Sequence, residues 1–317
     1  MNQEENLSAD DRVLLQLGRR LHADGYRFVT PTPLTHQRVN QRDEGQKCDS
    51  LRDVFGWSRP FEAGLLSSDE QRQLQDAQVI DEYQGQFKSR VRWSSLDDLL
   101  FVHSAFPTDA ADAVFFGPDT YRFAQLIHAH LQQNFAPIRR AVDIGCGAGV
   151  GAILIGRARR EAEVLALDIN PAALRLTAIN AALAEVANVE ARHSDLLQGV
   201  DGEFDLIVAN PPYMADPAAR AYRHGGGTLG AGLSLRIVEQ ALNRLSPGGS
   251  LLLYTGVAMV DGHDPFLDTV LPRLDEKRFG WTYRELDPDV FGEELSNPGY
   301  QRVDRIAVVG LTVTRIG

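Results

Sequence analysis

Residues 140–151 read RAVDIGCGAGVG, and the order of residue types in them indicates the class of fold. Ala141 to Gly145 has the apolar composition of a buried strand, glycines form a turn directly after it, and Val150 begins a run with apolar residues at helical spacing. Glycine permits a left-handed backbone and close approach to a ligand, and the first amides of a helix are free to bind it. The stretch therefore predicts a strand, a binding turn and a helix in immediate succession.

Beyond this stretch, short apolar runs alternate with amphipathic helices, which is typical of a parallel sheet covered by helices on both faces. The expected strands are residues 141–145, 164–168, 189–195, 205–210 and 250–256, and the expected helices are residues 150–160, 171–184 and 232–245. The last two apolar runs, 281–287 and 305–315, have no helix between them and predict an antiparallel hairpin at the sheet edge. The expected fold class is α/β, with a doubly wound sheet.

The first third of the chain has a different pattern, and a length of 317 residues is enough for two domains. Residues 10–24 and 68–80 predict helices, residues 86–93 predict a strand, and several prolines interrupt the rest. We therefore expect a smaller N-terminal α+β domain for substrate recognition over residues 1–110. The second domain is expected over residues 111–317.

An acidic residue ends the strand that follows the glycine turn. Asp168 comes 23 positions after Gly145, close to the ~20-residue interval at which a carboxylate binds ribose hydroxyls in a nucleotide-binding βαβ unit. A nucleoside-containing cofactor is therefore expected. Gly147, Gly149 and Ala152 also satisfy the G-x-G-x-x-A pattern of NAD enzymes, so spacing alone leaves a dehydrogenase open.

The fourth strand ends in Asn210-Pro211-Pro212-Tyr213. The Asn210 side-chain oxygen and the Pro211 carbonyl are two acceptors, which match the two hydrogens of a planar amide or an exocyclic amino group. The prolines hold these acceptors rigidly, and Tyr213 offers a ring for stacking. The four residues are the expected catalytic group, acting by orientation and electrostatic preorganisation without a metal or a dedicated strong base.

Together these motifs resemble the class I S-adenosylmethionine-dependent methyltransferases. The resemblance implies a Rossmann-like seven-stranded sheet and S-adenosylmethionine as methyl donor. Asp143 would lie near the methionine portion, Asp168 would hold the ribose, and Asp195 would meet the adenine amino group. The expected donor site also contains Gly145, Gly147, Gly149, Ile169, Leu196 and Asn210.

The acceptor motif resembles that of the adenine-N6 and guanine-N2 methyltransferases and of the release-factor and ribosomal-protein glutamine methyltransferases. Residues 225–227, 232–238 and 245–249 are similar to the stretch after the motif in the release-factor enzymes. Phe116 and Thr120 lie where those enzymes have a proline-rich turn beside the active site, so the resemblance implies that they bind substrate with Tyr213.

The net charge of the chain narrows the range of expected methyl acceptors. The formal charge of −11 opposes broad attraction to nucleic acid, so the expected acceptor is a protein glutamine or a small metabolite. A base amino group in RNA or DNA stays an alternative, as does a donor-binding module without catalysis. Lys88, Arg90 and Arg92 alternate along the expected strand 86–93 and could contact phosphates, although a solvated strand face is the favoured interpretation. The oligomeric state is not indicated.

Other features predict the setting of the protein. The polar, acidic start lacks an export signal and no apolar run approaches about 20 residues, so a cytoplasmic protein without a membrane segment is expected. Cys48 and Cys146, the two cysteines, are expected to be free thiols. The eight histidines show no helix pair typical of metal sites, and no metal is expected.

Overall fold

The structure is a computed structural model that describes residues 3–42, 47–215, 223–227 and 229–317. Across these residues, the central element is a seven-stranded sheet in the order β10-β11-β9-β8-β5-β6-β7. Its strands are β5 (Arg140–Ile144), β6 (Glu163–Asp168), β7 (Val189–His193), β8 (Phe204–Ala209), β9 (Leu245–Val260), β10 (Phe279–Asp287) and β11 (Val303–Arg315). The strands β5 to β9 pair in parallel, as expected from their near-continuous apolar runs.

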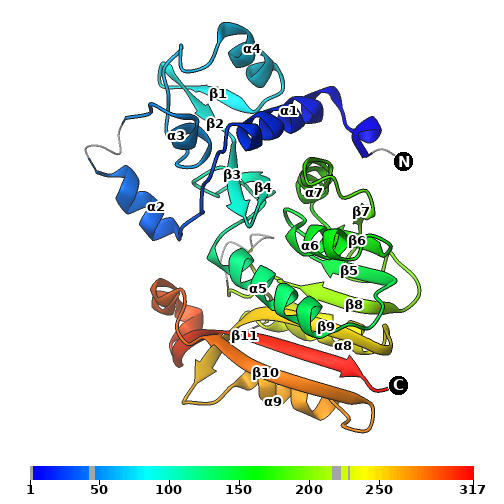
Figure 1. Cartoon of the computed structure of the whole chain (residues 1–317). Coiled ribbons are helices and arrows are strands. Elements are labelled where there is room, and N and C mark those ends of the chain that lie inside the picture. The colour runs from blue at the N-terminus through cyan, green and yellow to red at the C-terminus, as the bar shows by residue number, and fades with distance from the viewer. Residues whose placement is uncertain (1–2, 43–46, 216–222, 228) are drawn as a thin grey trace.

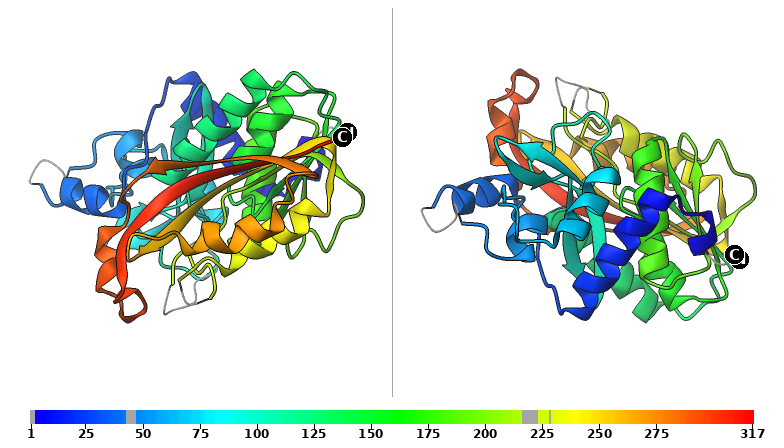
Figure 2. Two further views of the ribbon diagram at one scale, coloured as in Figure 1. Left: turned by 90° about the horizontal axis from the view of Figure 1, so that it is seen from below. Right: turned by 90° about the horizontal axis from the view of Figure 1, so that it is seen from above.

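Helices cover both faces of this sheet (Figures 1 and 2). One face carries α5 (Pro118–Gln133), α6 (Val150–Ala158) and α7 (Pro171–Leu183), and the other carries α8 (Gly232–Leu242) and α9 (Pro265–Val270). Apolar side chains from the strands divide into two core clusters, one under each layer of helices. The predicted α/β class with a doubly wound, Rossmann-like sheet is confirmed.

The C-terminal strands form the expected antiparallel pair, with Phe279 opposite Arg315. The strand β11 also pairs antiparallel with β9, so the last strand of the chain lies inside the sheet and β10 forms its edge. The loop between them contains two short 3-10 helices, η4 (Gly292–Ser296) and η5 (Pro298–Tyr300). This loop stands beside the segment that follows β8.

The strand order places the ligand-binding edge. The chain runs outward from β5 through β6 to β7, and then returns to place β8 on the other side of β5. Open α/β sheets bind ligands at the carboxyl ends of the strands, where the order reverses in this way. The glycine turn follows β5 and Asn210 follows β8, so these two motifs stand on the two sides of the reversal.

The N-terminal region packs on the helix layer formed by α6 and α7 (Figure 1). Its elements are η1 (Gln3–Asn6), α1 (Ala9–Ala23), α2 (Pro33–Asn40), α3 (Leu51–Phe55), α4 (Ser68–Asp76), β1 (Ile80–Tyr83), β2 (Gln86–Ser89), β3 (Val91–Leu96) and β4 (Leu99–Ser104). Asn180 of α7 is fully buried and bonds both backbone groups of Val102 at 2.8 and 3.0 Å. The boundary near residue 110 stays a prediction, because apolar side chains of both regions share one cluster.

Three predictions for the N-terminal region are wrong in detail. The expected strand 86–93 is two strands in different hairpins, because the Ser89 hydroxyl bonds both backbone groups of Val91 and turns the chain at that point. Arg92 is 4% exposed and donates to the His36 ring at 3.2 Å, so it does not belong to a solvated face. The expected helix 68–80 ends at Asp76, and the chain then enters β1.

Within the described residues, no helix is long and apolar enough to cross a membrane.

Candidate active site

The glycine turn after β5 has a left-handed backbone at three positions. The φ angles of Gly145, Gly147 and Gly149 are 69°, 55° and 80°, in the region that side chains beyond glycine rarely adopt. A Cβ at Gly149 would lie 2.7 Å from Cγ2 of Thr177, whereas one at Gly145 or Gly147 would meet nothing within 4 Å. The first two glycines therefore present bare backbone to open space, and the third allows α7 to pack closely.

Asp143 supports this turn from below. Its side chain is 1% exposed, and its Oδ2 accepts a hydrogen bond from the backbone N–H of Ala152 at 2.9 Å, in the first turn of α6. A Cβ at Gly151 would lie 2.7 Å from the same oxygen, so that glycine is required for the contact. Burial, with the nearby charge of Asp168, raises the pKa of Asp143 to about 7.

Asp168 links the end of β6 to the glycine turn. Its Oδ2 accepts from the Gly147 N–H at 3.0 Å, and its Oδ1 accepts from the Asn170 N–H at 2.9 Å. Burial raises the pKa of its carboxyl, and the backbone hydrogen bonds oppose that rise. The side chain is half-buried at the cavity described below, so it can also meet hydroxyl groups of a ligand.

Asp195, which is predicted to meet the adenine of the donor, lies shortly after β7. Asp195 is exposed, and its Oδ2 lies 3.1 Å from Nη2 of Arg236 on α8. Leu196 is buried with a left-handed φ of 52°, and Ile169 is 55% exposed. All three predicted residues line the cavity, which has a carboxylate at one wall and apolar surface beside it.

Asn210 and the two prolines lie across the cavity from the glycine turn. Asn210 is half-buried, and its side-chain amide makes no hydrogen bond to any residue in the described part of the chain. Pro211 is buried and Pro212 is half-buried. Within the described residues, the Asn210 amide at the cavity wall therefore has no protein partner that would compete with a ligand.

Tyr213 is held more tightly than the sequence indicates. It is 7% exposed, and its hydroxyl donates to Oδ2 of Asp119 at 2.5 Å. A Cβ at Gly256 would lie 2.1 Å from two ring carbons, so the ring rests directly on the backbone of β9. Phe291 approaches the ring edge-on, with 6.1 Å between ring centroids. Stacking of Tyr213 on a substrate stays a prediction.

The two predicted substrate residues at and before the start of α5 have different surroundings. Thr120 lines the cavity, and its hydroxyl accepts from the Gly117 N–H at 3.2 Å, which fixes the start of the helix. Phe116 is 1% exposed and stacks on His103 with ring centroids 4.9 Å apart, so it belongs to the core between the two regions. Its neighbour Phe115 lines the cavity, which corrects the expectation for Phe116.

These residues surround one cavity of about 240 Å³. Its walls come from the ends of β5 to β8, the start of α5, one side of α8 and the loop between β10 and β11. Among the described residues, the lining includes every predicted donor and acceptor position except Gly149 and Phe116, together with Asp119, Arg223, Phe291 and Phe115. The donor and acceptor motifs therefore open into a shared space.

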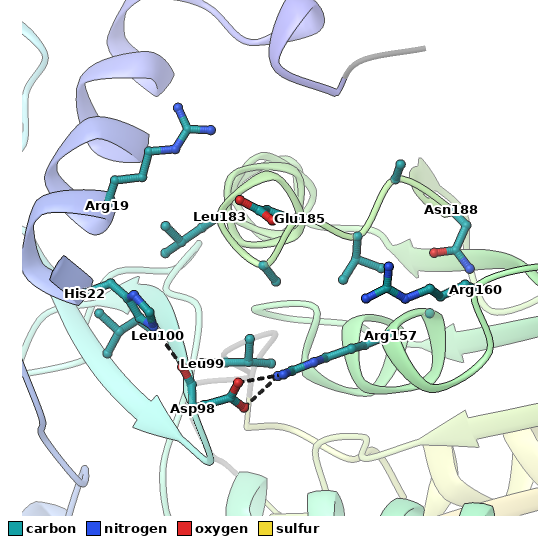
Figure 3. A pocket seen from close by; sticks show the side chains of 14 residues that line it. Arg19, His22, Asp98, Leu99, Leu100, Arg157, Arg160, Leu183, Glu185 and Asn188 are labelled. Atoms are coloured by element: carbon teal, nitrogen blue, oxygen red, sulfur yellow. Dashed lines mark hydrogen bonds and ion pairs between the residues drawn. The ribbon is translucent and has the colours of Figure 1, made fainter. Parts of the chain in front are cut away.

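A larger cavity, of about 620 Å³, lies between the N-terminal region and the ends of α6 and α7 (Figure 3). The helix α6 starts at the glycine turn, and the larger cavity lies at the other end of this helix. The larger cavity is therefore at the amino ends of the parallel strands, away from the glycine turn. Arg157 in its wall pairs with Asp98 through contacts of 2.6 and 2.7 Å, and His22 bonds the Asp98 carbonyl at 3.0 Å. No predicted site residue lines it, so the smaller cavity is the candidate active site.

Comparison with known proteins agrees with the class that this fold and site define. The family model described as "Methyltransferase small domain" matches residues 111–260. With the sheet order, the left-handed glycine turn and the acid at the end of β6, this match identifies a methyltransferase domain of the Rossmann-like class.

The chain belongs more narrowly to the family of glutamine methyltransferases. It is 30% identical to a ribosomal protein uL3 glutamine methyltransferase of Xanthomonas campestris over 234 residues, which cover 69% of this chain and 70% of that protein. It is 34% identical to a release factor glutamine methyltransferase of Deinococcus radiodurans over 200 residues, 59% of this chain and 66% of that protein. The aligned part of this chain spans 54%, 60% and 66% of the lengths of three such release-factor enzymes, which is less than two thirds in each case.

A solved structure of a T. thermophilus 16S rRNA N2 methyltransferase, in complex with AdoMet and guanosine, resembles this one with a TM-score of 0.46. The two are 18% identical, and the match covers 78% of this chain and 62% of that chain. A likeness at this level carries no information on substrate.

Among the cavity residues that sequence reasoning missed are Asp119, Phe115, Arg223 and Phe291. An acid at the second position of a helix is read as a partner for the helix dipole, so Asp119 gave no sign of burial. Arg223 forms an ion pair with Glu294, and Phe291 reaches the cavity from a loop 78 positions after Tyr213. Contacts of such range leave no local pattern.

Proposed function

We propose that this chain transfers the methyl group of S-adenosylmethionine to the side-chain amide nitrogen of a protein glutamine. The observation that carries the proposal is the shared cavity, which joins Asp168 and the glycine turn on one side to Asn210-Pro211-Pro212-Tyr213 on the other. Support for the glutamine acceptor comes from the family, because relatives of this chain carry the names of release-factor and ribosomal-protein glutamine methyltransferases.

The residues present fit the donor. Bare backbone at Gly145 and Gly147 faces open space, and the half-buried Asp168 can accept hydrogen bonds from two vicinal hydroxyls. We assign Asp168 to the ribose, Asp195 with Ile169 and Leu196 to the adenine, and the glycine turn to the methionine end. When bound, the donor supplies a methyl group attached to a positively charged sulfonium sulfur. After the methyl group has been transferred, the rest of the donor leaves as a neutral thioether.

The acceptor side orients a weak nucleophile. An amide nitrogen is planar because its lone pair is delocalised into the carbonyl. In the proposed complex, the Asn210 side-chain oxygen and the Pro211 carbonyl each accept one N–H of that nitrogen, which aims its lone pair into the donor half of the cavity. The same two oxygens stabilise the positive charge that develops on the nitrogen as its new bond to carbon forms. The nitrogen then loses one proton to water.

The test uses the purified chain, donor labelled in its methyl group, and a lysate separated into protein, RNA and small-molecule fractions. We expect label in the protein fraction, and mass spectrometry of the digested protein should locate the added methyl on a glutamine. Label confined to RNA or to small molecules would contradict a protein acceptor. Label in no fraction, with the donor bound in calorimetry, would favour a binding module and contradict methyl transfer.

A further inference from the structure

A buried carboxylate joins the acceptor motif to two distant elements. Asp119, the second residue of α5, is 5% exposed, and both of its oxygens accept hydrogen bonds from tyrosine hydroxyls. Tyr213 of the acceptor motif donates to Oδ2 at 2.5 Å, and Tyr254 of β9 donates to Oδ1 at 2.8 Å. One side chain thus ties the start of α5 to the acceptor motif and to the centre of the sheet.

The network continues to the edge strand. Nη1 of Arg122 lies 3.4 Å from Oδ1 of Asp119, one helical turn away, and Nη2 of Arg122 donates to Asp287 at the end of β10 at 2.7 Å. Arg122 therefore compensates the charge of Asp119 and is itself held by a second carboxylate. The arrangement fixes the orientation of the Asp119 carboxyl plane from outside the cavity.

This network has an energetic cost that packing alone does not explain. Burial raises the pKa of Asp119, while the two hydroxyl groups and the charge of Arg122 oppose that rise. Buried charged groups are often replaceable by apolar residues without loss of stability, so their presence is weak evidence for a stabilising role. A carboxylate at this place fixes the positions of the two tyrosine hydroxyl groups, because each of its oxygens accepts a hydrogen bond from one of them.

The position of the Tyr213 hydroxyl affects Asn210, because both residues belong to the same short acceptor motif. The Asn210 side chain has no hydrogen-bond partner within the described ranges, and two prolines separate it from Tyr213. Proline fixes its own φ angle, so the orientation of Tyr213 is transmitted along a stiff segment to Asn210. With its ring resting on Gly256 and its hydroxyl on Asp119, Tyr213 is held at two points.

We propose that Asp119 is a positioning residue, which places Asn210 and Pro211 for the acceptor by holding the Tyr213 hydroxyl. The inference rests on the proposed function and adds to it the origin of the acceptor geometry. Tyr213 is in this view the far anchor of the acceptor motif, and its contribution to transfer runs through its hydroxyl. The donor half of the cavity does not depend on the contact.

The test compares Asp119→Ala, Tyr213→Phe and the double variant in steady-state transfer and in donor calorimetry. Each single variant is expected to lower kcat by about 10- to 100-fold, because small displacements of orienting groups have effects of that size. The donor Kd should stay within about two-fold. Both substitutions remove the same contact, so the double variant should lose little more than either single one.

A matched control comes from a second tyrosine–carboxylate pair outside the cavity. The Tyr283 hydroxyl donates to Oδ2 of Asp264 at 2.5 Å, at the start of α9. Tyr283→Phe should keep the wild-type kcat. Tyr213→Phe retains the ring volume, so it tests the same contact if Asp119→Ala does not fold.

A second measurement does not depend on transfer. A hydroxyl proton donated to a buried carboxylate exchanges slowly and resonates downfield in proton NMR. The Tyr213 hydroxyl resonance, assigned by its loss in Tyr213→Phe, should also vanish in Asp119→Ala and persist in Tyr283→Phe. Its persistence in Asp119→Ala would overturn the inference.

The outcomes separate the inference from the proposed function. A wild-type chain that transfers methyl, with an Asp119→Ala variant of unchanged kcat, contradicts the role of Asp119 alone. Multiplicative losses in the double variant contradict it too, because they show that the two residues act apart. A wild-type chain that transfers no methyl to protein contradicts the proposed function itself, and with it any role of Asp119 in transfer.

Discussion

The proposed donor half of the cavity contains the glycine turn and Asp168, and the proposed acceptor half contains residues 210–213. The two halves are held together in different ways. In the donor half, Asp143 bonds Ala152 across 9 positions of sequence, and Asp168 bonds Gly147 across 21. In the acceptor half, Tyr213 bonds Asp119 across 94 positions. The first half is therefore built by one strand–turn–helix unit and its neighbour, whereas the second needs α5 and β9 to dock before it exists.

This difference predicts that the two halves can be damaged separately. A substitution in the donor half should act on donor affinity, because its partners are backbone groups of the same unit. A substitution in the acceptor half should act on kcat, because its side chains orient the second substrate after the donor is bound. The predictions below probe that separation, beginning with the largest expected effect.

Asn210→Ala should lower kcat by about 100- to 1,000-fold, the usual loss when one group of a preorganised electrostatic site is removed. The donor Kd should change little, because the glycine turn and Asp168 are untouched. Labelled transfer and calorimetry measure the two quantities. Asn243→Ala, at the exposed end of α8, is the matched control. Retention of activity in Asn210→Ala would show that the acceptor nitrogen is bound elsewhere.

Gly149→Ala probes the donor half. The residue has a φ of 80°, and the new Cβ would lie 2.7 Å from Cγ2 of Thr177, so the variant should lose about 1–2 kcal/mol of unfolding free energy from the backbone alone. We expect donor affinity to fall about 10-fold as the turn shifts. Thermal denaturation and calorimetry provide the measurements.

The control for that variant is Gly262→Ala, in an exposed turn with a φ of 76° and open space around its Cβ. It should show a similar backbone cost with unchanged donor affinity. Equal losses of affinity in the two variants would mean that the effect is global and that the glycine turn has no special contact with the donor.

Gly256→Ala probes the acceptor half without touching a polar group. The new methyl would lie 2.1 Å from the Tyr213 ring, so the ring must move and carry the acceptor motif with it. We expect kcat to fall about 10-fold while the donor Kd is unchanged. Gly280→Ala in β10, where a Cβ meets nothing within 4 Å, should leave both unchanged. A loss of donor affinity in Gly256→Ala would break the proposed separation.

The smallest effect concerns pH. The pKa of Asp143 is about 7 in the folded chain and 3.8 when unperturbed, so the folded state holds its proton more firmly. Stability from this group is complete below about pH 4 and is lost as pH rises toward 7. Between pH 5 and 6 the loss should be about 1.4 kcal/mol relative to Asp143→Asn, which lacks the titration. Denaturant unfolding at the two pH values measures it, and parallel curves for both proteins would contradict it.

Features that depend on residues close together in the sequence were predicted, and features that depend on contacts between distant residues were not. The strands, the glycine turn and the carboxylate of Asp168 were predicted because their patterns occupy consecutive residues with a fixed period or interval. Phe116 was assigned to the cavity and Phe115 was not, although the two are adjacent. Which of two neighbouring aromatic side chains faces the cavity depends on how α5 docks, and no local pattern records that.

The N-terminal region shows the same limit. The alternation of Lys88, Arg90 and Arg92 indicated one strand face, but the Ser89 hydroxyl breaks the strand and Arg92 turns inward to His36. Period-two patterns assume an unbroken ladder. A side-chain hydrogen bond to the backbone can end the ladder without any glycine or proline to mark the place.

The α/β sheet, the glycine turn and the proposed type of acceptor nitrogen could be predicted from the amino-acid sequence, because each depends on backbone conformation and hydrogen-bonding groups within a few residues. The position of β11 inside the sheet, the place of Phe115 in the cavity lining, and the contact of Asp119 with Tyr213 came from the folded structure. Those features arise when elements far apart in the chain pack together, and burial then gives an ordinary helix-start carboxylate its two tyrosine partners.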